Sequence, residues 1–181
     1  MSMSKEEIID MVLEMYDARK ETKEYLEFYA NPDEDGKLEE YKKIITEEFY
    51  PAKNTREPKT RFSICRKAVS DYRKLKPSQD KLADLMLCYV ENACQFTYDY
   101  GDMWEQYYTS VENNFEKTMA FIAKNNMLEH FKPRLRQCME WASPCGWGFT
   151  NTKPLKTANP CNSESYTDLP FSDCYCLLSL D

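Results

Sequence analysis

Residues 82–96 read LADLMLCYVENACQF, and this stretch decides the fold class. Its apolar side chains recur every three or four residues, at Leu82, Leu85, Met86, Tyr89, Val90, Ala93 and Phe96. This spacing places them on one face of an α-helix, whereas a half-buried strand would alternate apolar and polar residues. We therefore predict a long amphipathic helix here.

The same helical period continues on both sides of this stretch. Six further apolar stripes lie within residues 4–143, and no segment alternates like a strand. Five of them lie in residues 21–30, 38–49, 62–75, 104–122 and 131–142. The first consists of Ile8, Ile9, Val12, Leu13 and Tyr16, preceded by a capping box of Ser4 and Glu7. Short connections favour antiparallel neighbours, so we expect an all-α fold of about seven helices, as an antiparallel bundle or a short stack of helical hairpins.

The C-terminal part has a different composition. Residues 144–181 carry four of the nine prolines and four of the eight cysteines, and no helical period survives there. We expect one all-helical domain over residues 1–150, followed by an extended or disordered tail over residues 151–181. Four thiolates could bind zinc, but the spacing of Cys145, Cys161, Cys174 and Cys176 lacks the paired units of structural zinc sites. Free thiols and no metal are the favoured interpretation.

Charge is strongly segregated along the chain, whose net charge is −7. Residues 53–76 carry nine basic side chains against Glu57 and Asp71, and residues 82–116 carry seven acidic side chains and no basic one. The candidate anion- or partner-binding residues are Arg61, Arg66, Lys67, Arg73 and Lys74. Such a segment suits nucleic acid, phosphate or an acidic partner. We favour the alternative that it complements this protein's own acidic face, within the fold or across a dimer.

A second candidate site combines carboxylates with aromatic rings near residues 91–108. Its members are Glu91, Asp99, Tyr100, Asp102 and Trp104. Aromatic faces and carboxylates together attract a cationic ligand. The same composition also suits a helix–turn–helix junction, where Tyr and Trp bury their rings and keep their polar tips wet. We favour this structural interpretation.

Several chemistries are excluded by residue counts. His130 is the only histidine, so zinc hydrolases and di-iron bundles that need paired histidines are excluded. Four glycines are too few for a phosphate-cradling loop architecture. The sequence identifies no catalytic residues, and we expect no cofactor. We favour a protein that is not an enzyme. Neither a signal segment nor a membrane-length apolar run occurs, which favours a cytoplasmic protein without a membrane association.

Five blocks of sequence are similar to a known family. They are KEYLEFYANPD (23–33), EFYP (48–51), SDYRK (70–74), LADLML (82–87) and GWGF (146–149). Over residues 4–150 the chain resembles a family of bacterial proteins known only as a domain of unknown function. The resemblance implies an all-helical cytoplasmic protein, and it implies no activity and no site residues.

Taken together, the residues favour a helical binding or scaffolding module with separate acidic and basic faces. Its expected partner is a protein or a second copy of the chain, since segregated charge specifies partners. Two alternatives stay open. One is binding of an anion or nucleic acid through residues 53–76, and the other is an enzyme with an acidic aromatic pocket near residues 91–108.

Overall fold

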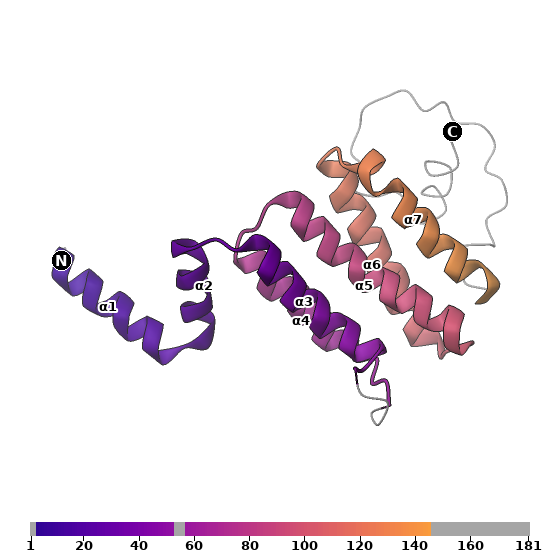
Figure 1. Ribbon diagram of the computed structural model, residues 1–181, viewed down its shortest axis with the longest axis horizontal. Helices are drawn as coiled ribbons and strands as arrows, with labels where there is room; N and C mark the ends of the chain where they lie inside the picture. Colours follow the sequence, from indigo (N-terminus) through magenta and orange to yellow (C-terminus); the bar gives the residue numbers. More distant parts are fainter. Residues whose placement is uncertain (1–2, 53–56, 146–181) are drawn as a thin grey trace.

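The computed structural model describes residues 3–52 and 57–145, and within them it confirms the all-α fold (Figure 1). The helices are α1 (Lys5–Ala18), α2 (Lys20–Ala30), α3 (Glu34–Phe49), α4 (Phe62–Lys74), α5 (Gln79–Tyr100), α6 (Glu105–Lys124) and α7 (Leu128–Ala142), followed by a 3-10 turn, η1 (Ser143–Cys145). These seven α-helices match the predicted ones in number and order, and the described residues contain no strand. The predicted tail over residues 151–181 lies outside the described residues.

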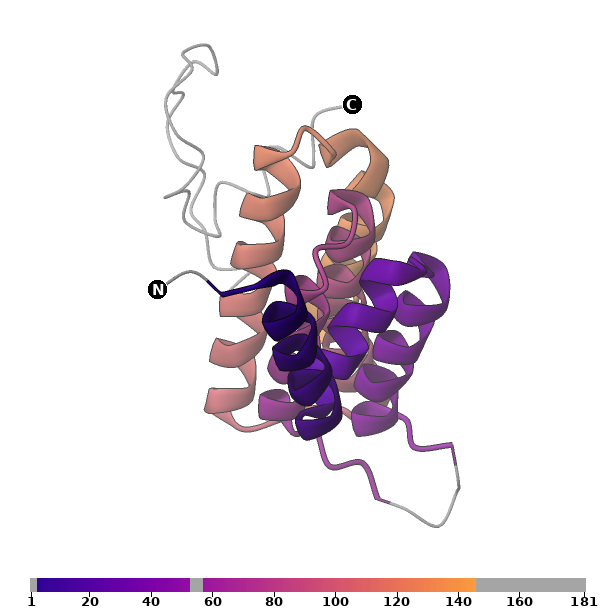
Figure 2. The same ribbon diagram turned by 90° about the vertical axis from the view of Figure 1, so that its left-hand side faces the viewer.

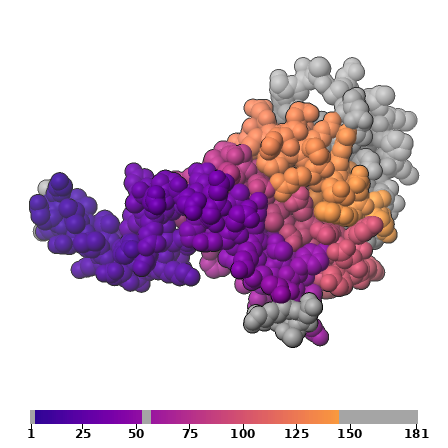
Figure 3. Space-filling view, in the orientation of Figure 1, coloured from indigo at the N-terminus to yellow at the C-terminus, as the bar shows by residue number. Residues whose placement is uncertain are grey.

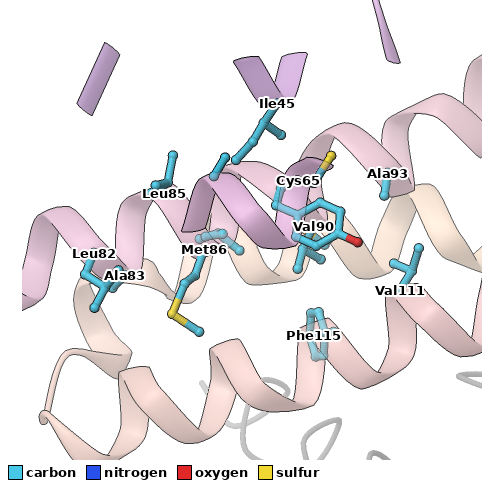
Figure 4. Close-up of a cluster of buried hydrophobic side chains, with 14 of the residues drawn as sticks. Ile45, Cys65, Leu82, Ala83, Leu85, Met86, Val90, Ala93, Val111 and Phe115 are labelled. Carbon is cyan, nitrogen blue, oxygen red and sulfur yellow. The ribbon is translucent and has the colours of Figure 1, made fainter. Parts of the chain in front are cut away.

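Helix α5 is the centre of the bundle because it packs against α3, α4, α6 and α7. All seven apolar residues of the predicted stripe are buried, and Ala83, Leu87 and Cys88 on its other faces are buried too. A helix that is apolar nearly all round belongs in a core surrounded by neighbours. Figure 4 shows α5 side chains meeting Ile45 of α3, Cys65 of α4 and Phe115 of α6.

Local sequence sets several helix ends. The Asp33 carboxylate caps α3 by accepting a hydrogen bond from the Gly36 amide at 2.9 Å. A Cβ at position 36 would clash with the Asp33 carboxylate, so any larger residue there would require this carboxylate to shift from its capping position. At the C-terminal end of α5, Gly101 has a φ of +89°, a conformation that favours glycine.

Helices α1 and α2 form an arm that extends from the bundle (Figures 1 and 3). Helix α2 is attached to the bundle, because Phe28 is buried and the Tyr41 hydroxyl of α3 donates to the Glu24 carboxylate at 3.1 Å. Lys37 of α3 also pairs with Glu24 at 3.3 Å. Helix α1 packs against α2, and the view along the arm shows it standing in front of the bundle (Figure 2).

The predicted capping box of α1 is confirmed. The Ser4 hydroxyl accepts from the Glu7 amide at 3.2 Å, and the Glu7 carboxylate accepts from the Ser4 amide at 2.7 Å. No residue of α1 is buried, however. Ile8 is 45% exposed and Leu13 is 56% exposed. An amphipathic helix usually buries its apolar stripe against a core, but the stripe of α1 stays open to solvent.

Candidate protein-binding groove

A groove with an apolar floor and a basic rim runs between α4 and α6. It has a volume of about 430 Å³, and α5 forms its base through Met86 and Tyr89. Apolar atoms of the floor also come from Val69 of α4 and Phe121 of α6. Four exposed cations stand on its rim: Arg66 and Arg73 of α4, with Lys117 and Lys124 of α6. We call this feature the α4/α6 groove.

Helical spacing explains how these residues come to share one groove. Cys65, Ala68 and Tyr72 bury one face of α4 in the core. Arg66, Val69 and Arg73 lie at positions i, i+3 and i+7, so they share the neighbouring face. Residues 114, 117, 118, 121 and 124 follow the same rule on α6. Helices α4 and α6 therefore each line the groove with a face that carries both apolar and basic side chains.

The groove contains no carboxylate among its lining residues. Arg73 donates to the Met86 sulfur at 3.5 Å, and Asn114 donates to the Tyr89 hydroxyl at 3.4 Å. Burial raises the pKa of Tyr89 above its ordinary value, so this hydroxyl is neutral at physiological pH. Within the described residues, no acidic side chain lies within 4.0 Å of the four rim cations. Its four cations therefore have no acidic partner at ion-pair distance in the part of the chain that the structure describes.

The structure separates the five basic residues predicted from sequence. Arg61 binds the Glu48 carboxylate through Nε and Nη2 at 2.9 and 2.7 Å. Lys67 and Lys74 both pair with Asp71 of their own helix. Only Arg66 and Arg73 reach the groove, where Lys117 and Lys124 join them. Sequence reasoning missed these two lysines, although their spacing of seven on one helix face was a signal that could have identified them.

A larger hollow lies between α2, α3 and α4, with a volume of about 730 Å³. Its charged lining is balanced, since the five lysines face five acidic residues. Several of these are already paired, including Lys37 with Glu24 and Lys74 with Asp71. A surface that neutralises itself has little charge left to select a partner.

The residues of the predicted acidic aromatic pocket do not gather at one place. Glu91 faces α7, where its carboxylate binds Arg134. Asp99 lies eight residues further along α5, about 12 Å, and accepts from the Tyr50 hydroxyl at 2.7 Å. The Tyr108 hydroxyl donates to Asp102. Tyr100 and Trp104 are more than half exposed. The structure brings Asp99 and Tyr100 together near Tyr50, without Glu91.

An ion-pair network across α3, α5 and α7 was not predicted. Arg134 of α7 pairs with Asp84 and Glu91 of α5, and Lys42 of α3 pairs with Asp84 at 2.8 Å. Burial alone would raise the pKa of Asp84, but hydrogen bonds from Lys42 and Arg134 outweigh it and lower this pKa. The network links the helices on two sides of α5.

The four helical cysteines are buried free thiols. They are Cys65, Cys88, Cys94 and Cys138. Among the described residues, no cluster of three or more His, Cys, Asp or Glu side chains could hold a metal ion. Cys161, Cys174, Cys176 and the side chain of Cys145 lie outside the described part of the chain. His130 is exposed and packs edge-on against Phe131.

Within the described residues, no helix has the length and apolarity needed to cross a membrane.

Comparison with known proteins identifies a family. No curated protein matches this chain, and no solved structure matches it. Residues 1–154 match a family described as Family of unknown function (DUF6155), which agrees with the resemblance over residues 4–150. This match spans all seven helices, so the chain belongs to the Family of unknown function (DUF6155).

Proposed function

We propose that this protein is a protein-interaction module whose α4/α6 groove binds an acidic amphipathic helix. The observation that carries the proposal is the combination of an apolar floor with four rim cations and no carboxylate in the lining. An amphipathic helix docks by laying its apolar face into such a groove, while charges along its edges meet the rim. Met86 in the floor adapts to side chains of different shape.

Nucleic acid fits this groove less well than a helix does. Phosphate recognition needs cations, but it does not need an apolar floor of Val69, Met86 and Phe121. The chain as a whole carries a net charge of −7, which opposes nonspecific binding of a polyanion. An acidic amphipathic helix uses both properties of the groove, the apolar floor and the basic rim.

Binding of a designed peptide tests this function. The probe is a fluorescent 14-residue peptide with Leu at helical spacing and Glu on the opposite face, compared with a scrambled peptide of the same composition. Its affinity for the full chain is measured by fluorescence polarisation. We expect the Lys117→Glu, Lys124→Glu double variant to raise the Kd of the amphipathic peptide by about tenfold or more, because the rim charge is reversed.

The matched control changes the same amount of charge elsewhere. Lys43 of α3 and Lys59 are exposed and lie outside the groove, so Lys43→Glu with Lys59→Glu should leave peptide affinity within about twofold. Equal binding of the scrambled peptide, or equal loss in both double variants, would contradict the proposal. Tighter binding of a single-stranded oligonucleotide, lost only in the groove variant, would replace it with nucleic-acid binding.

A further inference from the structure

Helix α1 has the chemistry that the α4/α6 groove selects. Its apolar side chains lie at helical spacing and are exposed: Ile8, Ile9, Met11, Val12, Leu13 and Met15 are between 37% and 56% exposed. Acidic residues follow on the other side of the helix, at positions 6, 7, 10, 14 and 17, against the single cation Lys5. The helix therefore carries a net charge of −4 and an apolar face of which no residue is buried.

Charge and length both match the groove. The rim carries four positive charges, and α1 carries a net of four negative ones. A helix of 14 residues is about 21 Å long, and α4, the shorter wall of the groove, has 13 residues and is about 20 Å long. The hollow between α2, α3 and α4 lacks this complementarity because its charges balance.

The connection between α1 and α2 directs α1 away from its own bundle. Only Arg19 separates the two helices. The Tyr16 hydroxyl donates to the Glu27 carboxylate at 2.8 Å, and the Lys23 ammonium lies 5.2 Å from the Tyr16 ring centre. Since α2 is itself attached to α3, these contacts hold α1 on an outward-pointing arm (Figures 1 and 3). The apolar face of α1 thus stays exposed to solvent.

We propose that α1 of one copy docks in the α4/α6 groove of a second copy, and that the exchange is reciprocal. This rests on the proposed function, since it names the helix that the groove takes. A two-fold dimer uses the same helix and the same groove twice, which doubles the buried surface. The dimer buries the exposed stripe of α1 and pairs its acidic edge with Arg66, Arg73, Lys117 and Lys124.

A mixing experiment with full-length variants tests the exchange. The helix variant carries Ile8→Gln and Val12→Gln, which remove apolar surface while keeping helix propensity. The groove variant carries Lys117→Glu and Lys124→Glu. Association is measured by sedimentation velocity and native mass spectrometry, and folding is checked by circular dichroism. We expect each variant alone to be a monomer at concentrations where the unaltered chain is dimeric, with a dimer Kd raised by about tenfold or more.

The equimolar mixture is the decisive sample. The intact α1 of the groove variant meets the intact groove of the helix variant, so one of the two docking contacts is restored and heterodimers form. A matched control removes two other exposed apolar side chains, Tyr29→Gln and Ile44→Gln, which are 77% and 43% exposed. This control should remain dimeric.

Each other outcome overturns the exchange. A monomeric unaltered chain excludes it, and a groove variant that still dimerises places α1 elsewhere, for example against α1 of the partner. Monomeric variants whose mixture stays monomeric show that α1 of one copy does not bind the groove of another, although both features are needed for the dimer. Loss of dimer in the Tyr29 and Ile44 control shows a different interface. In all these cases, specific binding of the designed peptide would still support the groove as a helix-binding site, so the two proposals fail separately.

Discussion

Arg134 of α7 binds Glu91 of α5 through two parallel hydrogen bonds, from Nε to Oε1 and from Nη2 to Oε2, each 2.7 Å long. This planar, two-point contact is the geometry in which an arginine–carboxylate pair is strongest. The remaining guanidinium nitrogen, Nη1, donates a hydrogen bond to Asp84, which precedes Glu91 on α5. A single side chain therefore joins α7 to two positions along the central helix.

Removing Arg134 should destabilise the bundle. In Arg134→Met, Asp84 and Glu91 lose their shared partner, and in the unaltered chain both side chains are only about one-fifth exposed. We expect the free energy of unfolding to fall by about 1–2 kcal/mol, a value reduced because Arg134 is partly exposed. Urea denaturation measures the change. Lys43→Met removes an exposed cation as a control, and an equal loss in both variants would show that the network contributes nothing specific.

Stability should fall at acid pH, because the pKa values of Asp84, Glu48 and Asp71 are lowered in the folded chain. A lowered folded-state pKa contributes stability that is fully present above the unfolded value, which is 3.8 for an aspartate. That contribution is lost as the pH falls from this value through the folded-state pKa.

The Arg134→Met variant provides the check on this assignment. Without Arg134, the pKa of Asp84 moves back toward its ordinary value, so less stability remains to be lost in acid. Urea midpoints of both chains, followed from neutral pH to below the lowered pKa, should therefore converge as the pH falls. A constant difference across this range would show that Asp84 is not the group responsible.

Glu48 anchors the residues that enter α4. Its carboxylate binds the Arg61 guanidinium and accepts from the Arg61 amide at 3.3 Å, and its backbone carbonyl accepts from the amides of Lys59 and Thr60. Glu48→Met should cost about 1–3 kcal/mol of unfolding free energy, since a buried charge-assisted contact is lost. Glu47→Met, at the exposed neighbouring position, should cost less than about 0.5 kcal/mol.

Hydrogen exchange locates this effect. The Arg61 amide should exchange faster in Glu48→Met because its acceptor is gone. The Tyr50 amide, which donates to the Thr46 carbonyl at 2.7 Å, should keep its protection. Uniform acceleration at both amides would indicate global destabilisation instead.

The buried cysteines should be unreactive in the folded chain. Burial raises the pKa of the Cys65 thiol to about 12 and that of Cys88 to about 11. A hydrogen bond with Cys94 and burial raise the pKa of Cys138. Since the thiolate is the nucleophile, a pKa of about 12 in place of 9.0 lowers the reactive fraction of Cys65 about a thousandfold.

Peptide mapping after iodoacetamide treatment measures this directly. We expect no alkylation at the four helical cysteines in buffer and complete alkylation in urea. Rapid modification of Cys65 or Cys88 without denaturant would contradict their burial.

The sequence by itself determined the helices, because helix formation and capping depend on residues three or four positions apart. The stripe of Leu82 to Phe96 predicted α5, and Ser4 with Glu7 predicted the start of α1. These features depend on residues that are close in sequence, so they can be predicted from the sequence alone.

Only the tertiary structure decided which charges are neutralised and which faces stay open. Arg61 and Arg66 look alike in sequence, but Arg61 meets Glu48 of α3 while Arg66 stands on an open groove. The partners of Arg134 lie more than 40 residues away. The apolar stripe of α1 has the same spacing as the stripes that form the core. The stripe is nevertheless exposed, because α1 extends away from the bundle. Contacts between helices that are distant in sequence depend on how the helices pack. A pattern of residues three or four positions apart does not predict this packing.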